Sequence, residues 1–215
     1  MRPEVPERQP ESPRQRILDA ASSVFAEEGF AGARVDDIAA RAGVNKAMLY
    51  YHVGDKQALY TAVLVRTFDR VAAAIADALE VGGSPRSRLV AVITALTRIV
   101  RQHPDHPRMV LREVASGAAN LPPEALSRML EVVDVVASLL TEGVASGEFR
   151  STDPVLTHLA IVGTVVFINA ISPVRERAAA LRPDNELPDP SIDIAAFLSD
   201  LLLEGIVART HDGGN

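Results

Sequence analysis

The chain has 215 residues, of which 47% are hydrophobic and only 4% aromatic, and it contains neither tryptophan nor cysteine. This length allows one or two domains with a sizeable core, which must be built from alanine and aliphatic side chains. The absence of cysteine excludes disulfides, thiolate metal sites and cysteine nucleophiles, and it fits the reducing cytoplasm in which we expect the protein to work. The formal net charge of −6 argues against indiscriminate binding to nucleic acids, so any DNA-binding surface must be local.

Neither the N-terminal residues nor the most apolar run predicts a targeting or membrane segment. Residues 1–12 mix proline, glutamate and arginine without periodicity and lack the apolar core of a signal peptide, so we interpret them as a flexible arm. The most apolar run, residues 155–171, includes three polar residues and is short for a bilayer span. It is better interpreted as a helix buried in protein, and we expect no membrane partner.

Helix start and stop signals predict four helices in the first 80 residues. The first begins with Ser12 as N-cap followed by proline, and stops at Gly29, since glycine readily adopts left-handed backbone. Asn45 can cap a short helix further along, and Gly54-Asp55 ends that helix and caps the next. The expected elements are a helix from residue 13 to Gly29, short helices at 35–42 and 46–52, and a connector helix at 56–80.

Five further helices are predicted in the remainder. Ser84-Pro85 opens the first, and the two prolines of HPDHP at 103–107 forbid a regular helix there. Pro173 is interpreted as a stop signal for the fourth. The expected helices cover 84–102, 107–118, 123–146, 153–172 and 191–208. No segment alternates as a strand would, so the predicted fold is all-α, with about nine helices and a C-terminal bundle.

A helix-turn-helix pattern lies within about residues 35–54, VDDIAARAGVNKAMLYYHVG. Small Ala39 lets the two short helices approach closely, Gly43 permits the tight turn between them, and Leu49 locks the second onto the first. Met48 is expected to point inward together with Leu49. In this arrangement the second helix lies in the major groove of DNA, so residues 13–55 are predicted to form a DNA-binding domain.

Residue types that are rare elsewhere gather in the same region. Residues 44–60 hold both lysines and all three tyrosines of the chain. Tyrosine hydroxyls, lysine ammonium groups and helix N-termini all bond phosphate oxygens. Small Ala47 would let the backbone approach base edges. We expect Lys46, Ala47, Tyr50, Tyr51 and His52 on or near the exposed side, Lys56 at a second phosphate contact, and Tyr60 in the core.

The block GFAGARVDDIAARAGVNKAMLYYHVGDKQALY resembles the DNA-binding domain of TetR-type transcriptional regulators. The resemblance is specific over residues 14–60 and only architectural beyond about residue 80. It implies a regulator rather than an enzyme, most simply a repressor without a cofactor, which binds a palindromic operator as a homodimer and leaves it when a small-molecule effector binds. The DNA-facing residues that it implies are Arg34, Asn45, Lys46, Ala47, Tyr50, Tyr51, His52 and Lys56.

Two positions depart from the family pattern. Arg34 stands where the family usually has serine or threonine, and a guanidinium cannot accept a capping bond, although it can reach a phosphate. Val53 stands where phenylalanine is usual, so a smaller side chain packs between the third and fourth helices. Neither change removes the motif.

Residues 84–210 are predicted to bind the effector and to dimerise. The resemblance places the dimer contact in the last two long helices, here 153–172 and 191–208. Both have more apolar residues than one core-facing stripe requires. These are Leu156, Leu159, Ile161, Val165 and Val166 in the first helix, and Ile194, Phe197, Leu198, Leu201 and Leu202 in the second.

Candidate effector contacts are Phe68, Met109, Arg112, Phe167 and Asn169. Arg112 can instead pair with neighbouring Glu113, and Asn169 can be a satisfied core group, an interface contact or a ligand anchor. His103 and His106 with Asp105 have the residue types of a metal site but lack further converging ligands, so we expect no metal. An all-α enzyme or an interaction module that does not use its helix-turn-helix are the alternative functions.

Overall fold

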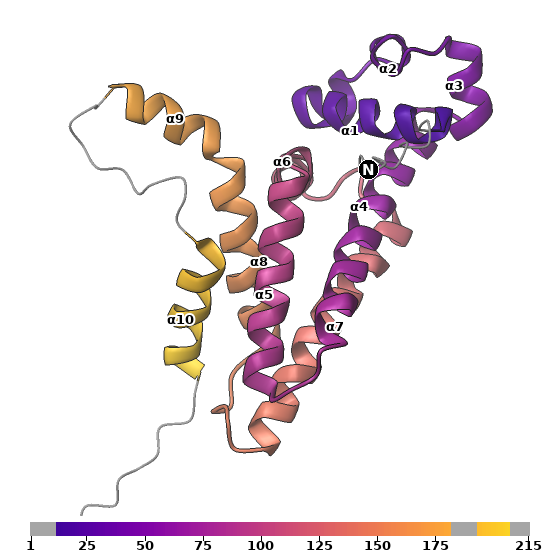
Figure 1. Cartoon of the computed structure of the whole chain (residues 1–215). Coiled ribbons are helices and arrows are strands. Elements are labelled where there is room, and N and C mark those ends of the chain that lie inside the picture. Colours follow the sequence, from indigo (N-terminus) through magenta and orange to yellow (C-terminus); the bar gives the residue numbers. More distant parts are fainter. Residues whose placement is uncertain (1–11, 182–192, 207–215) are drawn as a thin grey trace, which may run out of the picture. The chain divides into compact units, whose positions relative to one another are not determined.

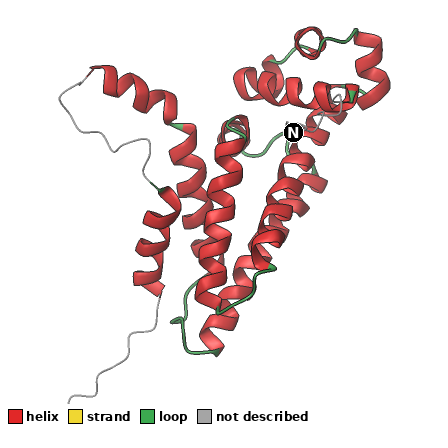
Figure 2. Ribbon diagram, in the orientation of Figure 1, coloured by secondary structure: helices red, strands yellow, loops and turns green. Residues whose placement is uncertain are grey.

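The computed structural model describes residues 12–181 and 193–206, which form ten α-helices (Figure 1). Turns and loops connect them, without a strand in these two ranges (Figure 2). The all-α prediction is therefore confirmed. Most of the expected N-terminal arm and the two ends of the expected helix 191–208 lie outside the described residues. The chain divides into two compact units, Met1–Leu64 and Val65–Asn215.

The N-terminal unit contains three helices and the beginning of a fourth. The four are α1 (Pro13–Gly32), α2 (Val35–Ala42), α3 (Lys46–Val53) and α4 (Lys56–Leu79), the last of which continues into the second unit. Ser12 and Gln15 form the predicted capping box at the start of α1. Gly29 has a φ of 71°, as predicted, but it kinks α1 instead of ending it, and one further turn runs to Gly32. Asp55 caps α4 through a 2.8 Å bond from the Ala58 N–H.

Aliphatic and aromatic side chains hold the N-terminal unit together. α1 packs against both α2 and α3, and α2 packs against α3. The Tyr60 ring is buried, meeting Phe25 edge-on at 4.7 Å between centroids and Phe30 at 5.0 Å. The prediction that Tyr60 belongs to the core is confirmed. Edge-to-face aromatic pairs add about 0.5–1.5 kcal/mol to the burial of their area, which favours this fixed arrangement.

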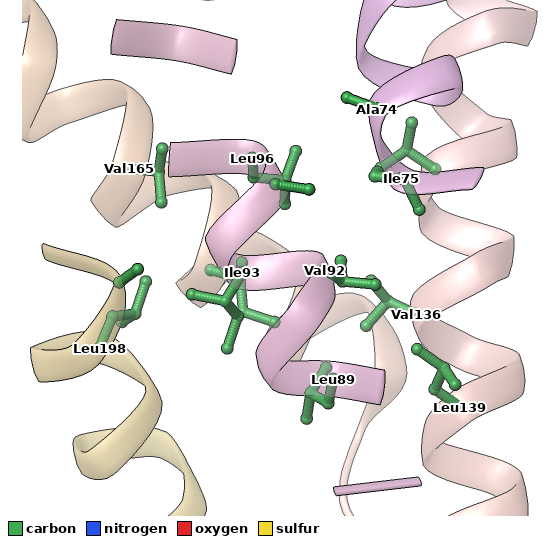
Figure 3. Packing of buried hydrophobic residues seen from close by; sticks show 14 of the residues in the cluster. Ala74, Ile75, Leu89, Val92, Ile93, Leu96, Val136, Leu139, Val165 and Leu198 are labelled. Atoms are coloured by element: carbon green, nitrogen blue, oxygen red, sulfur yellow. The ribbon is translucent and has the colours of Figure 1, made fainter. Parts of the chain in front are cut away.

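The C-terminal unit is a bundle around α5 (Pro85–Gln102), which packs against α7, α8 and α10. The other helices are α6 (Asp105–Ala115), α7 (Pro123–Ala145), α8 (Pro154–Ala170), α9 (Ser172–Leu181) and α10 (Ile194–Ile206). Figure 3 shows Leu89, Val92, Ile93 and Leu96 of α5 among Ile75, Val136, Leu139, Val165 and Leu198 of four neighbouring helices. The core is aliphatic, as the composition requires.

Two proline signals were interpreted wrongly. α6 begins at Asp105, two residues before its predicted start, because Pro107 falls in the first helical turn, where its missing N–H breaks no helical bond. Likewise α8 ends at Ala170, and Pro173 is the second residue of α9. This helix was not predicted from the sequence. In both places proline begins a helix where the sequence was taken to indicate a break.

A close contact connects the end of α7 to α10. The buried ring of Phe149 lies on Gly143, where an added Cβ would overlap the ring. The Phe149 N–H donates to the Gly143 carbonyl at 2.9 Å, and the next N–H, of Arg150, donates to the Ile206 carbonyl at 2.8 Å. The turn after α7 therefore fixes the last turn of α10, and glycine is required where the ring lies.

The apolar helix α8 bears on the membrane expectation. In the described ranges, no single helix combines the length and apolar composition needed to cross a bilayer. Pro154–Ala170 and Ser172–Ala178 reach these limits only when taken together, and the chain bends by 51° between them.

Candidate nucleic-acid interface

The predicted helix-turn-helix forms between α2 and α3. Gly43 has a φ of 65° and a ψ of 37°, a left-handed conformation that glycine adopts at no steric cost. The N–H groups of Gly43 and Val44 bond back to α2 carbonyls and close its end. The side chain of Asn45 then accepts a 2.8 Å bond from the Met48 N–H, which caps α3 as predicted. Sequence-local bonds therefore define both ends of the turn.

A single fully buried side chain anchors α3. Leu49 is 0% exposed, and α3 packs against both α1 and α2. The expectation that Met48 also points inward is wrong, since its side chain is 40% exposed. Adjacent positions on an α-helix are turned by about 100° from each other, so a helix of two turns that buries Leu49 turns its neighbour outward. Only Leu49 of α3 is buried, which leaves the rest of the helix surface for other contacts.

The residues predicted to face DNA lie at or near the surface. Tyr51 is 86% exposed and Tyr50 43% exposed, and the Tyr51 ring contacts the His52 ring edge-on at 5.2 Å. Six of the eight are exposed, and two are partly buried. The exposed ones are Arg34, Asn45, Lys46, Ala47, Tyr50 and Tyr51, and the partly buried ones are His52 and Lys56. Two phenols without a core role on one short helix are the strongest structural sign of a binding surface.

Two of the basic residues are already held by the protein. Lys46 Nζ lies 2.9 Å from the Asp36 carboxylate at the start of α2. That hydrogen bond and the charge of Asp36 raise the pKa of Lys46, so the ammonium stays charged. Lys56 Nζ lies 4.9 Å from the centre of the Phe30 ring and donates to the Ala31 carbonyl at 3.3 Å. The cation–π contact and the hydrogen bond together fix Lys56 beside the end of α1.

The remaining charges of this surface are mixed. Arg34 stands at the N-cap of α2 and makes no side-chain capping bond there, as its chemistry predicts. Arg41, at the other end of α2, forms a bidentate ion pair with Glu27 at 2.8 and 2.9 Å, which connects α2 to α1. The first turn of α2 also carries Asp36 and Asp37, beside the basic groups. The positive surface is therefore small and local, as the net charge of the chain requires.

The predicted effector contacts do not share one environment. Phe68 and Met109 are buried, whereas Arg112 is exposed and the Phe167 side chain is 55% exposed on α8. The Asn169 amide is partly buried and donates to the Val165 carbonyl of its own helix at 2.7 Å. That bond gives the amide N–H a partner within its own helix, and α6, which carries Met109, packs against α8, which carries Phe167.

Sequence reasoning missed two buried polar groups near Met109 on α6. His106 is buried and stacks on His103, with 4.7 Å between ring centres. Burial, helped by the nearby charges of His103, Arg70 and Arg66, lowers the pKa of His106 to about 3, so the ring is neutral.

Glu113 is buried as well, and its carboxylate accepts a 3.2 Å bond from the Asn120 N–H. The sequence had assigned these residues to a bend and to an ion pair, and it carried no signal of burial. No group of three or more metal-ligating residues occurs within the described ranges.

The two helices predicted to dimerise have one buried and one exposed apolar face. Ile161 and Val165 of α8 and Leu198 of α10 are buried in the bundle. The exposed large apolar residues are Val155, Leu156, Leu159 and Phe167 on α8, and Phe197 and Leu201 on α10. An apolar surface that the described residues leave exposed is a candidate contact for a second protein surface.

Comparisons with known proteins agree with this architecture. Residues 17–63 match the family described as bacterial regulatory proteins, tetR family, and residues 82–170 match a tetracyclin repressor-like C-terminal domain. The chain is 31% identical over 141 residues to the HTH-type transcriptional regulator RutR of Escherichia coli K12, an alignment that covers 66% of each protein. It is 29% identical over 197 residues to the HTH-type transcriptional repressor NicS of Pseudomonas putida, covering 90% of this chain and 92% of NicS.

A solved structure extends the likeness in fold to nearly the whole chain. The structure of a regulatory protein of the tetR family from Rhodococcus RHA1 matches with a TM-score of 0.73 and 24% identity, over 93% of this chain and all of that one. Both the helix-turn-helix domain and the helical bundle therefore have structural counterparts in that protein. With the matched families covering the helix-turn-helix and most of the bundle, the chain belongs to the TetR family of DNA-binding transcriptional regulators.

Proposed function

We propose that the protein is a ligand-responsive repressor that binds a palindromic operator as a homodimer and releases it when a small-molecule effector binds. The observation that carries this proposal is the surface of α3, which is anchored by Leu49 and leaves Ala47, Tyr50 and Tyr51 exposed. NicS is named a transcriptional repressor, and its alignment covers 90% of this chain. This supports repression as the direction of regulation. The cytoplasm, where a bacterial operator lies, is the proposed location.

The residues of this surface divide into two roles. Ala47, with its small side chain, allows close approach to base edges and can touch a thymine methyl group. Lys46, Tyr50, Tyr51 and Lys56 carry hydroxyl or ammonium donors, which suit phosphate oxygens. Arg34, Asn45 and His52 complete the proposed surface. Phosphate contacts set the position of the helix, whereas base contacts choose the sequence.

The homodimer is proposed to form through α8 and α10. Leu156, Leu159 and Phe167 on α8 and Leu201 on α10 are large apolar side chains that one chain leaves exposed. Covering this area with the same area of a second copy would give a two-fold dimer, the commonest symmetry of such assemblies. Two reading helices spaced roughly 34–36 Å apart would then enter successive major grooves of a palindromic site.

The effector site is proposed within the C-terminal bundle. Phe68 and Met109 are buried there and favour an apolar effector, with Arg112, Phe167 and Asn169 as further candidate contacts. An effector that binds more tightly to a conformation with another spacing of the reading helices draws the population away from DNA. Such coupling between sites is typically about 1–3 kcal/mol.

The test of DNA binding begins with duplex fragments selected from the host genome by the purified protein. Binding is then measured by filter retention or fluorescence anisotropy at two salt concentrations. We expect selective binding that weakens with salt, because basic side chains release counterions from DNA. Lys46→Ala should weaken binding to all sequences, whereas replacing Ala47 should change the preferred sequence. Binding without sequence preference or salt dependence would favour an interaction module that does not use its helix-turn-helix.

The test of the dimer uses charge on the exposed apolar face. Leu159→Arg and Leu201→Arg should each shift the sedimenting species from dimer to monomer, since an unpaired charge in an apolar contact is costly. The control is Val81→Arg, because Val81 is 89% exposed and lies outside both helices. A protein that sediments as a monomer before any substitution would overturn the proposed dimer.

A further inference from the structure

The ion pair between Lys46 and Asp36 joins the two helices of the helix-turn-helix on its outer side. Asp36 lies in the first turn of α2, and Lys46 is the first residue of α3. The ammonium and the carboxylate are 2.9 Å apart, and the two side chains are 50% and 57% exposed. Each group therefore has a partner in the protein while about half of its surface still faces solvent, where a DNA phosphate can approach.

Other contacts already supply what this ion pair could contribute to the fold. Leu49 anchors α3, the Gly43 turn sets its start, and the Arg41–Glu27 pair ties α2 to α1. Ion pairs between exposed side chains contribute little to stability, because water screens the attraction and both side chains lose conformational freedom. The Lys46–Asp36 pair is therefore not required to hold the two helices together.

A carboxylate and a DNA phosphate compete for the same ammonium group. Both are oxyanions that accept short, charge-assisted hydrogen bonds from lysine. Lys46 can leave Asp36 for a phosphate, and Asp36 then faces the negatively charged DNA without its partner. Lys46 can also share its three N–H donors between Asp36 and a phosphate, and the carboxylate then offsets part of its charge beside the DNA. Both outcomes cost binding free energy, and this cost does not depend on the base sequence.

We propose that Asp36 is a tuning residue of the reading domain, which holds Lys46 in the free protein and thereby lowers affinity for DNA of every sequence. This inference rests on the proposed DNA-binding function. The benefit is that phosphate contacts alone bind the protein only weakly, so that base contacts from α3 decide where it stays. A chain with a net charge of −6 and only two lysines thus restrains one of them with a carboxylate.

The neighbouring residue offers a matched control. Asp37 is exposed, lies in the same first turn of α2, and has the same charge as Asp36. Asp36→Asn and Asp37→Asn therefore change the net charge and the interaction with the helix dipole equally. Only Asp36→Asn removes the contact with Lys46. A difference between the two variants isolates the effect of the ion pair.

The experiment measures binding of the full-length protein to an operator duplex and to a random duplex of the same length, over a range of salt concentrations. We expect Asp36→Asn to tighten binding to both duplexes by about threefold to tenfold, and to steepen the salt dependence by about one counterion for each subunit bound. Asp37→Asn should change either quantity much less. The thermal unfolding midpoints of both variants should match that of the unchanged protein.

A second pair of variants tests whether Asp36 acts through Lys46. In a Lys46→Ala background, adding Asp36→Asn should tighten binding no more than Asp37→Asn does, because no ammonium is left to release. A larger gain there, or equal gains from Asp36→Asn and Asp37→Asn when Lys46 is present, would overturn the proposal in favour of plain repulsion of DNA by acidic groups. If the unchanged protein binds DNA but Asp36→Asn behaves identically, only this inference fails. If the unchanged protein shows no salt-dependent binding, the proposed function fails with it.

Discussion

The two units of the chain use their side chains in opposite ways. In the N-terminal unit the exposed residues of interest are polar or aromatic, such as Tyr51 and Lys46, and one leucine anchors the helix that carries them. In the C-terminal unit the exposed residues of interest are apolar, such as Leu159 on α8 and Leu201 on α10, and the buried polar groups are the unusual ones. The residue types in one short sequence segment therefore indicate a DNA-binding surface. A dimer or effector surface depends instead on which apolar helix faces are covered by other helices.

The largest expected effect tests how narrowly α3 is anchored. Leu49→Ala should destabilise the N-terminal unit by about 2–5 kcal/mol, because it removes a fully buried side chain and leaves a cavity. DNA binding should be lost in parallel. The measurement is denaturant unfolding followed by circular dichroism, with Met48→Ala as control, since Met48 is partly exposed on the same helix. An equal loss from both variants would contradict the single-anchor interpretation.

The next effect tests packing in the C-terminal unit. Gly143→Ala should destabilise the protein by about 1–3 kcal/mol, because the new methyl group overlaps the buried Phe149 ring. Combining it with Phe149→Leu should cost less than the sum of the two single changes, since the smaller side chain makes room. Thermal unfolding of the four proteins measures this coupling. Strict additivity would show that the ring moves aside freely.

The third effect concerns pH and the buried histidines. The pKa of His106 is about 3 in the folded chain and about 6.5 when unfolded, so below pH 6.5 the unfolded chain binds the extra proton. Stability should therefore fall as pH drops through 6.5 towards 3, by about 1 kcal/mol between pH 7.5 and 5.5. Burial lowers the pKa of His158 too, which adds to the same trend.

His106→Leu provides the control for this pH dependence. Leucine is apolar and has a side chain of similar length, so it can fill the buried position, but it cannot take up a proton. Urea midpoints measured from pH 7.5 to 5.5 should fall less steeply for His106→Leu than for the unchanged protein. Parallel slopes would place the pH sensitivity elsewhere in the chain.

The smallest effect is expected at the surface of the N-terminal unit. A double-mutant cycle of Glu27→Ala and Arg41→Ala should give a coupling of about 0.2–1 kcal/mol, since both side chains are nearly half exposed. The coupling should decrease as salt is added, because exposed charges are screened. A coupling above that range which salt leaves unchanged would mean that this pair is as important to the N-terminal unit as its apolar core.

Local signals explain which features could be predicted. The caps at Ser12 and Asn45 and the left-handed turn at Gly43 depend on residues within a few positions, and the structure confirms each of them, whereas Gly29 has the predicted positive φ but does not end its helix. The window that holds both lysines and all three tyrosines likewise lies within one short segment. Because hydrogen bonds of this kind close over three or four residues, the sequence alone could indicate the helix-turn-helix and its family.

Contacts between distant segments explain what could not be predicted. The ion pair between Asp36 and Lys46 and the burial of His106 both depend on how one helix packs on another. The outward position of Met48 and the exposure of Phe167 follow from helix rotation, which an apolar side chain does not specify by itself.

The sequence by itself therefore determined the all-α architecture, the reading helix and most of the residues exposed on it, because short-range bonds and spacing suffice for these. Only the tertiary structure decided which apolar faces are covered, which polar groups are buried and which groups restrain the two lysines. The physical reason is that burial and ion pairing depend on neighbours that packing, rather than chain order, brings together.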